Sequence, residues 1–263
     1  MNNSNMENLK NLTDIEQDHL LILDVPLYVF AGLMLPMTIV GVILNAFTIL
    51  VLLHPRMRNS TNFYLTALSI ANIFCLLVWM FLYSFRYLFS YKTFQNNIYF
   101  GYYEVNKYES LVNYLLRFIM PIFSTLQLYS IYLTCAVTVD RFIYVNWPLK
   151  ADKICTIRST IVTISILFFC CVFYNLPRWF EVDSDLKVAA NTNVSYYQAK
   201  GTWFASNSLY RQIYLRYCYF IFVYGLPFAV LLIVNIGIIR KLIATEKRKL
   251  HLLGNFILKF DLI

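Results

Sequence analysis

The stretch FIMPIFSTLQLYSIYLTCAVTVDRFIYVNWPLK, residues 118–150, decides the fold. Its first part, residues 118–139, carries no charge and is long enough for a helix that crosses the ~30 Å hydrocarbon layer of a membrane. The run ends at Asp140 and Arg141, an acid beside a base. Charges are costly inside a span but tolerated where they reach water or protein, so the end of a span suits them. From the pair alone, a charged flank that stops the span and a functional site are equally good interpretations.

Four further windows without charge repeat this pattern, at residues 26–53, 59–85, 159–177 and 217–239. Hydrophobic residues make up 59% of the chain and charged residues 14%, which is more apolar than soluble domains usually are. Buried helices of a soluble protein are normally shorter and keep a polar face, so that alternative is disfavoured. We therefore predict an all-α, multi-pass transmembrane helix bundle, with helices near residues 26–53, 60–86, 111–145, 158–177 and 213–241.

The charges outside the windows predict the orientation of the chain. Basic residues near span ends stay on the cytoplasmic side. If the N-terminus is outside, the whole formal net charge of +8 falls on the inner side. We therefore expect an extracellular segment over 1–25, a transmembrane domain over 26–241 and a cytoplasmic tail over 242–263, in the plasma membrane. The basic balance then reflects topology and contact with membrane lipid, and is no evidence for nucleic-acid binding.

Sequons and cysteines bear on the same topology. Asn11 and Asn193 begin N-glycosylation sequons on the outer side and are the expected glycosylation sites. A third sequon, Asn59-Ser60-Thr61, lies inside and is expected to stay unmodified. None of the six cysteines falls in an outer loop, so no disulfide is expected. The sequence has no phosphate loop, His-Glu-x-x-His or Cys-x-x-Cys, so it indicates no enzyme, metal site or cofactor.

Several motifs resemble those of rhodopsin-like (class A) G-protein-coupled receptors. Asp140-Arg141-Phe142, followed by Trp147-Pro148-Leu149, is similar to the Asp-Arg-Tyr and Pro-Leu pattern at the inner end of the family's third helix. Asn45, Asn72 in YLTALSIANIF and Pro227 resemble interhelical positions of its first, second and fifth helices. YNLPRWFEV at 174–182 and CTIRSTI at 155–161 resemble the invertebrate FMRFamide-type neuropeptide receptors. The resemblance covers residues 26–241.

The resemblance implies a G-protein coupling site made of Asp140, Arg141, Phe142, Pro148 and Leu149. In the family, the arginine is held by the neighbouring aspartate and is then released into a cytoplasmic cavity that receives the C-terminus of a heterotrimeric G protein. Adjacent residues do not lie one helical turn apart, so a contact between Asp140 and Arg141 requires the long arginine side chain to bend back. Leu149 would make the apolar contact between the second inner loop and the G protein.

The resemblance also implies an amidated neuropeptide ligand on the outer side. A peptide that ends in Arg-Phe-amide needs a carboxylate for its guanidinium and aromatic walls for its ring, and the second outer loop offers both. In the third helix, Gln127 falls at a family pocket position and can hydrogen-bond a terminal amide. The candidate ligand-binding residues are Phe123, Ser124, Gln127, Trp179, Phe180, Glu181, Asp183 and Asp185. The alternative is that the acids are solvated surface and that Phe123 is packing.

The chain departs from the family pattern at three places. Asn72 stands where the family has an aspartate that coordinates sodium, so we expect no sodium site and instead a hydrogen bond between Asn72 and Asn45. The family's cysteine, expected near Leu116, is absent together with its partner in the loop. Residues 250–263 are too few and too polar for a span, so helices six and seven are expected to be missing. This tail would lie along the inner membrane surface, or it is equally well sequence read from an unspliced intron or a truncated gene model.

Three hypotheses for the function follow. The first is a neuropeptide receptor represented by an incomplete chain. The second is a five-span product that does not signal but pairs with the full-length receptor and alters its traffic. The third is a small channel or transporter, which would need charged or broken helices near the middle of the membrane, or inverted repeats, and the sequence shows neither.

Overall fold

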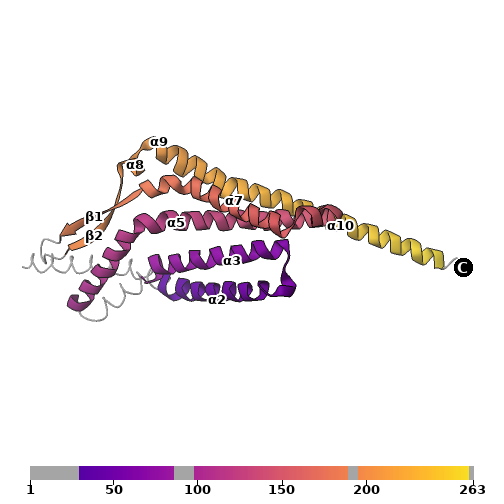
Figure 1. Ribbon diagram of the computed structural model, residues 1–263, viewed down its shortest axis with the longest axis horizontal. Coiled ribbons are helices and arrows are strands. Elements are labelled where there is room, and N and C mark those ends of the chain that lie inside the picture. The colour runs from indigo at the N-terminus through magenta and orange to yellow at the C-terminus, as the bar shows by residue number, and fades with distance from the viewer. Residues whose placement is uncertain (1–29, 86–97, 189–194, 261–263) are drawn as a thin grey trace, which may run out of the picture. The chain divides into compact units, whose positions relative to one another are not determined.

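The computed structural model describes residues 30–85, 98–188 and 195–260. These residues are mostly helical, as Figure 1 shows, which confirms the predicted helical membrane fold. Five helical stretches among them are long and apolar enough to cross a membrane: Gly32–Leu52, Ser60–Ser84, Lys107–Asn146, Ile157–Phe180 and Ser208–Leu250. Each contains or overlaps one of the five windows without charge, so the described residues hold a helix able to span a membrane at each predicted place.

Regular elements follow one another closely along the described chain. They are η1 (Phe30–Met34), α2 (Leu35–Leu52), η2 (Pro55–Met57), α3 (Ser60–Trp79), η3 (Met80–Ser84), α5 (Ile98–Asn146), α6 (Pro148–Ile154), α7 (Ile157–Asn175), η4 (Leu176–Phe180), β1 (Val182–Val188), β2 (Ser195–Gly201), α8 (Trp203–Ser206), α9 (Ser208–Tyr210), η5 (Arg211–Cys218), η6 (Phe220–Gly225) and α10 (Leu226–Phe260). The η elements are 3-10 helices at η2 and η4 and π-helices elsewhere. Strands β1 and β2 pair in a two-stranded sheet.

Capping residues explain where several helices begin. The side chain of Asn59 accepts a hydrogen bond from the backbone N–H of Asn62 at 2.9 Å, which fixes the start of α3. Thr156 does the same for α7, accepting from the N–H of Ser159 at 3.2 Å. Pro148 occupies the first position of α6, where its missing N–H removes no helical hydrogen bond.

The structure adds elements that hydropathy does not predict. Helix α5 begins at Ile98, before the predicted start near residue 111, and α10 continues past Lys241 to Phe260. Charged residues form helices well in water, so a limit set by tolerance of lipid is not the end of the helix. The paired strands β1 and β2 occupy the segment that the sequence presents only as an outer loop.

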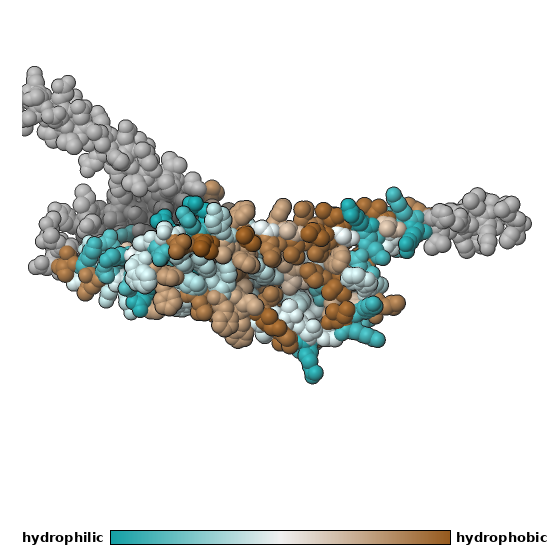
Figure 2. Space-filling model, turned by 90° about the horizontal axis from the view of Figure 1, so that it is seen from above, coloured by the Kyte–Doolittle hydropathy of each residue, from teal (hydrophilic) through white to brown (hydrophobic). Residues whose placement is uncertain are grey.

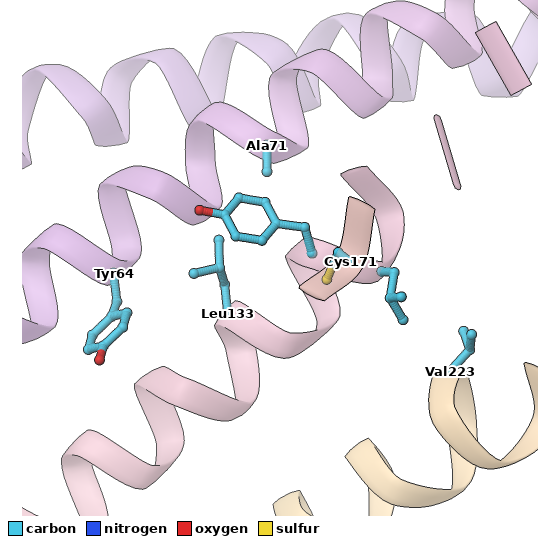
Figure 3. Close-up of a cluster of buried hydrophobic side chains, with 7 residues drawn as sticks. Tyr64, Ala71, Leu133, Cys171 and Val223 are labelled. Atoms are coloured by element: carbon cyan, nitrogen blue, oxygen red, sulfur yellow. The ribbon is translucent and has the colours of Figure 1, made fainter. Parts of the chain in front are cut away.

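Two compact units make up the chain. One comprises Met1–Leu44, Ile73–Ile119 and Asp183–Lys200, and the other comprises Asn45–Asn72, Met120–Val182 and Gly201–Ile263. The second unit has a buried cluster that draws on four elements, and Figure 3 shows these side chains directed toward one another. Its labelled members are Tyr64 and Ala71 of α3, Leu133 of α5, Cys171 of α7 and Val223 of η6. Small and medium side chains such as Ala71 and Cys171 let helices approach closely, as membrane helices need.

Many large apolar side chains of the spans face outward. Brown, hydrophobic residues cover much of the described surface in Figure 2. In α2, Phe47 is 65% exposed and Leu50 is 71% exposed. A soluble protein rarely leaves so many large apolar side chains in water, whereas lipid tails accommodate them without cost. The surface therefore fits a multi-pass membrane protein.

Candidate functional site

The carboxylate of Asp140 lies near the end of α5 and is held by hydroxyl groups. Asp140 is only 5% exposed. The hydroxyl of Ser60 donates a hydrogen bond to its Oδ1 at 2.9 Å, and the hydroxyl of Thr61 donates one to its Oδ2 at 2.6 Å. Ser60 shares a further hydrogen bond with the hydroxyl of Thr160, 2.6 Å away. These four residues, the Asp140 network, join α3, α5 and α7.

The start of α3 supplies two members of this network. Because Asn59 caps the helix, Ser60 and Thr61 fall in its first turn, and both are buried. A buried carboxylate is tolerated when its oxygens are hydrogen bonded, and both oxygens of Asp140 are. Sequence reasoning misses Ser60 and Thr61, because along the chain they belong to a sequon. The signal that could have found them is a run of short polar residues at a helix start that faces a charged span end.

Arg141 does not contact its neighbour in the structure. Its side chain is exposed, and no ion pair between Asp140 and Arg141 occurs among the described residues. The expected contact between the two is therefore absent in this conformation. Adjacent residues point to different faces of a helix, and the hydroxyls of Ser60 and Thr61 already occupy the carboxylate.

Phe142 is wedged between two partners. Its ring packs edge to face on Trp147, with ring centroids 5.7 Å apart. It also lies against Gly237 of α10, where an added Cβ would come within 2.6 Å of the ring. Trp147 precedes α6, which begins at Pro148 and presents Leu149 with 91% of its surface exposed. The packing thus connects α10 to the short helix that carries Leu149.

A cavity of about 320 Å³ lies beside the Asp140 network. Its lining includes Asp140, Ser60 and Cys155, together with apolar residues of α5 and α7. Burial, followed by the hydrogen bond with Asp140 and the negative charge of that residue, raises the pKa of the Cys155 thiol to about 11. The thiol is therefore neutral at pH 7 and a weak nucleophile.

A separate hydrogen bond joins α3 to α5 at Asn72. The hydroxyl of Ser130 donates to the carboxamide oxygen of Asn72 at 2.6 Å. The hydrogen bond of Asn72 to Asn45 stays a prediction. Pro227 accepts a weak hydrogen bond at its carbonyl from the thiol of Cys135, with sulfur and oxygen 3.8 Å apart. Asn72 and Pro227 thus both take part in contacts between helices, and their structural role stays a prediction.

Glu181 lies in a cluster of its own chain's side chains. The guanidinium of Arg178 lies 3.8 Å from its carboxylate, and the hydroxyl of Tyr210 donates a hydrogen bond to its Oε1 at 2.5 Å. Arg178 also stacks over the ring of Tyr219, 5.1 Å from the centroid. Its Nε is buried with no hydrogen-bond partner among the described residues. We call Arg178, Glu181, Tyr210 and Tyr219 the Glu181 cluster.

The other two loop acids also have basic partners. Asp183 lies 3.4 Å from Arg117, and Asp185 lies 3.4 Å from Lys200. All four side chains are well exposed, so water screens both pairs. Asp183 and Asp185 therefore each have a basic partner, but both ion pairs are weak.

Two side chains of α5 hold strand β2 by its backbone. The N–H of Tyr197 donates to the hydroxyl of Ser110 at 2.8 Å, and its carbonyl accepts from the side chain of Asn113 at 3.1 Å. The ring of Tyr197 packs on Tyr114, with centroids 5.0 Å apart. We call Ser110, Asn113, Tyr114 and Tyr197 the hairpin clamp. All six cysteines are free thiols, so the clamp is non-covalent.

The remaining predicted ligand-binding residues differ in exposure. Gln127 is exposed on α5, whereas Phe123 and Ser124 are half-buried there. On η4, Trp179 is 41% exposed and Phe180 is 64% exposed. The predicted glycosylation sites Asn11 and Asn193 lie outside the described residues. Asp183 and Asp185 fall in the first unit, and the other predicted ligand-binding residues fall in the second.

A known receptor family matches most of this chain. The family model for the 7 transmembrane receptor (rhodopsin family) matches residues 44–251. The matched range contains the Asp140 network, the Glu181 cluster and the hairpin clamp. The chain belongs to this family, which is a family of receptors and not of enzymes.

A comparison with curated proteins finds a similar receptor within this family. The FMRFamide receptor of Drosophila melanogaster is 29% identical over 222 residues, which cover 81% of this chain and 37% of that receptor. The chain therefore spans well under half the length of this relative. The match confirms the resemblance to invertebrate FMRFamide-type receptors that the strings at 155–161 and 174–182 indicate.

Proposed function

We propose that the protein is a plasma-membrane receptor that binds an amidated neuropeptide outside the cell and couples to a heterotrimeric G protein inside. The observation that carries this proposal is the similarity to the FMRFamide receptor over 81% of the chain. In the proposed orientation the N-terminus is extracellular. The paired strands then face outward, and the Asp140 network lies at the cytoplasmic boundary.

The exposed side chains near Asp140 support the coupling role. Arg141 is exposed, and Leu149 presents 91% of its surface on α6. A G-protein segment needs hydrogen-bond donors and an apolar contact, and these two residues offer both. The Asp140 network holds the carboxylate with hydroxyls, so Arg141 stays available to a partner. Phe142 and Pro148 would then hold α6 in position, and Arg141 and Leu149 would make the first contacts with the G protein.

The acids of the loop support a ligand role in which the peptide replaces a basic side chain of the protein. Each of Glu181, Asp183 and Asp185 already has a basic partner in the chain. A peptide guanidinium would therefore exchange with that partner. Asp183 and Asp185 are exposed and exchange at little cost, whereas the largely buried Glu181 exchanges at a higher one. Trp179 and Phe180 expose ring surface for the phenylalanine of the ligand.

Peptide binding to membranes from cells that express the full chain tests this proposal. The probe is Phe-Met-Arg-Phe-amide, and the control is the same tetrapeptide with a free carboxylate in place of the amide. We expect saturable binding of the amide and at least tenfold weaker binding of the acid, because the added charge must be desolvated in the pocket. Equal binding of the two, or no saturable binding of either, would contradict the proposal.

A further inference from the structure

An open pocket with a volume of about 810 Å³ gives the segment from Ser206 to Tyr224 a concave surface along one face. It begins at the end of the short helix α8 (Trp203–Ser206) and continues along the π-helices η5 and η6. Its lining residues are Ser206, Ser208, Arg211, Gln212, Leu215, Arg216, Tyr217, Tyr219, Phe220 and Tyr224. We call this the arginine face. Two of the ten are basic and none is acidic.

The π-helical geometry brings the two arginines to this face. In an α-helix, residues five apart lie about 140° apart around the axis, so Arg211 and Arg216 would point away from each other. In a π-helix, residue i bonds to residue i+5, so residues five apart lie about one turn from each other. Both arginines fall in η5, Arg211–Cys218, and both line the concave surface. π-helical turns are rare and occur often at functional sites.

Neither arginine has an acidic partner in the described part of the chain. Arg117 and Arg178 each pair with an acid, but the ion pairs found do not involve Arg211 or Arg216. Both side chains are exposed. Ser208 and Gln212 add a hydroxyl and an amide donor beside them. Two unpaired guanidinium groups with neutral donors around them form a complement to a carboxylate.

We infer that the arginine face binds an acidic side chain of the peptide ligand, located before its amidated end. This inference rests on the proposed function. A peptide fits better than a lipid headgroup, because Arg211 and the serines precede the window without charge that begins at residue 217. In the proposed orientation they therefore lie at the outer end of the fifth apolar stretch, Ser208–Leu250, on the side where the peptide arrives. Exposed rings of Tyr217, Phe220 and Tyr224 border the same surface and give apolar walls to the bound chain.

The test compares two six-residue peptides on membranes that carry the full chain. One is Asp-Asp-Phe-Met-Arg-Phe-amide, and the other is its neutral match, Asn-Asn-Phe-Met-Arg-Phe-amide. We expect the unmodified protein to bind the acidic peptide about tenfold more tightly, since exposed charge pairs contribute modestly. The double variant Arg211→Gln, Arg216→Gln should lose this preference and keep its affinity for the neutral peptide. Lys187→Gln, which removes an exposed charge elsewhere, should keep the preference.

The outcomes separate the two proposals. If the double variant retains the preference, or if the unmodified protein has none while binding both peptides, the inference is overturned and the proposed function stands. No saturable binding of either peptide overturns both. Vesicles of phosphatidylserine provide a further arm: a preference kept by the double variant together with lost vesicle binding would assign the arginine face to lipid and overturn the inference.

Discussion

Asp140 and Asp183 are the same residue type in very different settings. Asp140 is 5% exposed and is held by two hydroxyl donors at 2.6 and 2.9 Å. The side chain of Asp183 is 61% exposed and lies 3.4 Å from Arg117. Burial strengthens the first set of contacts and leaves any unpaired group costly, whereas water screens the second. The comparison teaches that the buried acid stabilises the bundle and that the exposed acid is free to exchange partners.

Replacing Asp140 should have the largest effect on stability. Asp140→Ala leaves the hydroxyl of Thr61 buried without its acceptor and removes two charge-assisted hydrogen bonds. We expect a loss of about 2–3 kcal/mol in the free energy of unfolding. Asp183→Ala should cost less than about 1 kcal/mol. Thermal unfolding of the purified variants in detergent measures both.

Asp140→Asn is the matched control for that experiment. The amide keeps one acceptor oxygen and the shape of the side chain. The midpoint of thermal unfolding of Asp140→Asn should therefore fall between those of the unmodified protein and Asp140→Ala. If Asp183→Ala lowers the midpoint as much as Asp140→Ala does, burial does not separate the two acids.

A glycine substitution probes the packing beside Asp140. In Gly237→Ala the new Cβ would lie 2.6 Å from the ring of Phe142, which Trp147 holds from the other side. Overpacking costs about 1–3 kcal/mol, and the helix propensity of alanine returns up to about 1, so we expect a net loss near 1 kcal/mol. Gly225→Ala serves as control because its Cβ would have 3.5 Å to its nearest neighbour. If Gly237→Ala is more stable than the unmodified protein, Phe142 is not packed tightly between Trp147 and Gly237.

The hairpin clamp offers a test on the exposed side of the comparison. Removing both side-chain partners of Tyr197 with Ser110→Ala and Asn113→Ala should speed amide exchange at Tyr197 by about tenfold or more, because each hydrogen bond contributes about 1 kcal/mol. Gln198→Ala, exposed on the same strand, should change little. Exchange should also be unaffected by a thiol reductant, since the clamp is non-covalent. Protection that survives the double substitution would show that other contacts hold the strand.

The smallest effect on stability is expected at Cys155, where reactivity is the readout. A pKa of about 11 in place of 9.0 lowers the thiolate fraction roughly a hundredfold at pH 8, so alkylation should be slow and should rise until pH approaches 11. Asp140→Asn removes the negative charge and should speed alkylation. The measurement uses a variant in which Cys155 is the sole cysteine. A rate that levels off near pH 9 would contradict the burial of this thiol.

Hydropathy predicts the spans but not the limits of the elements. Windows without charge locate all five spans, because lipid excludes charge along a length that sequence displays directly. The start of α5 at Ile98 and the continuation of α10 to Phe260 escape it, since those parts of the helices need not be apolar. Strand β2 makes hydrogen bonds with α5, whose residues lie far away along the chain, and hydropathy does not show such contacts.

For the site, residue types were predictable and partners were not. The sequence singles out Asp140, Arg141 and Glu181, because charges near spans are few. That Asp140 binds Ser60 and Thr61 in preference to Arg141 depends on two helices meeting. The arginine face escapes sequence reasoning for a geometric reason. Residues five apart share a face only in a π-helix, which composition does not reveal.

The proposed receptor depends on one central claim: the strands with Asp183 lie outside the cell, and the region around Asp140 lies inside it. A membrane-impermeant amine reagent on intact cells, followed by mass spectrometry, tests it through four exposed lysines. The proposed orientation predicts labelling of Lys187 and Lys200 on the strands, and labelling of Lys150 and Lys153 on α6 only after the cells are permeabilised. Labelling of Lys150 and Lys153 on intact cells, with Lys187 and Lys200 protected, would contradict it.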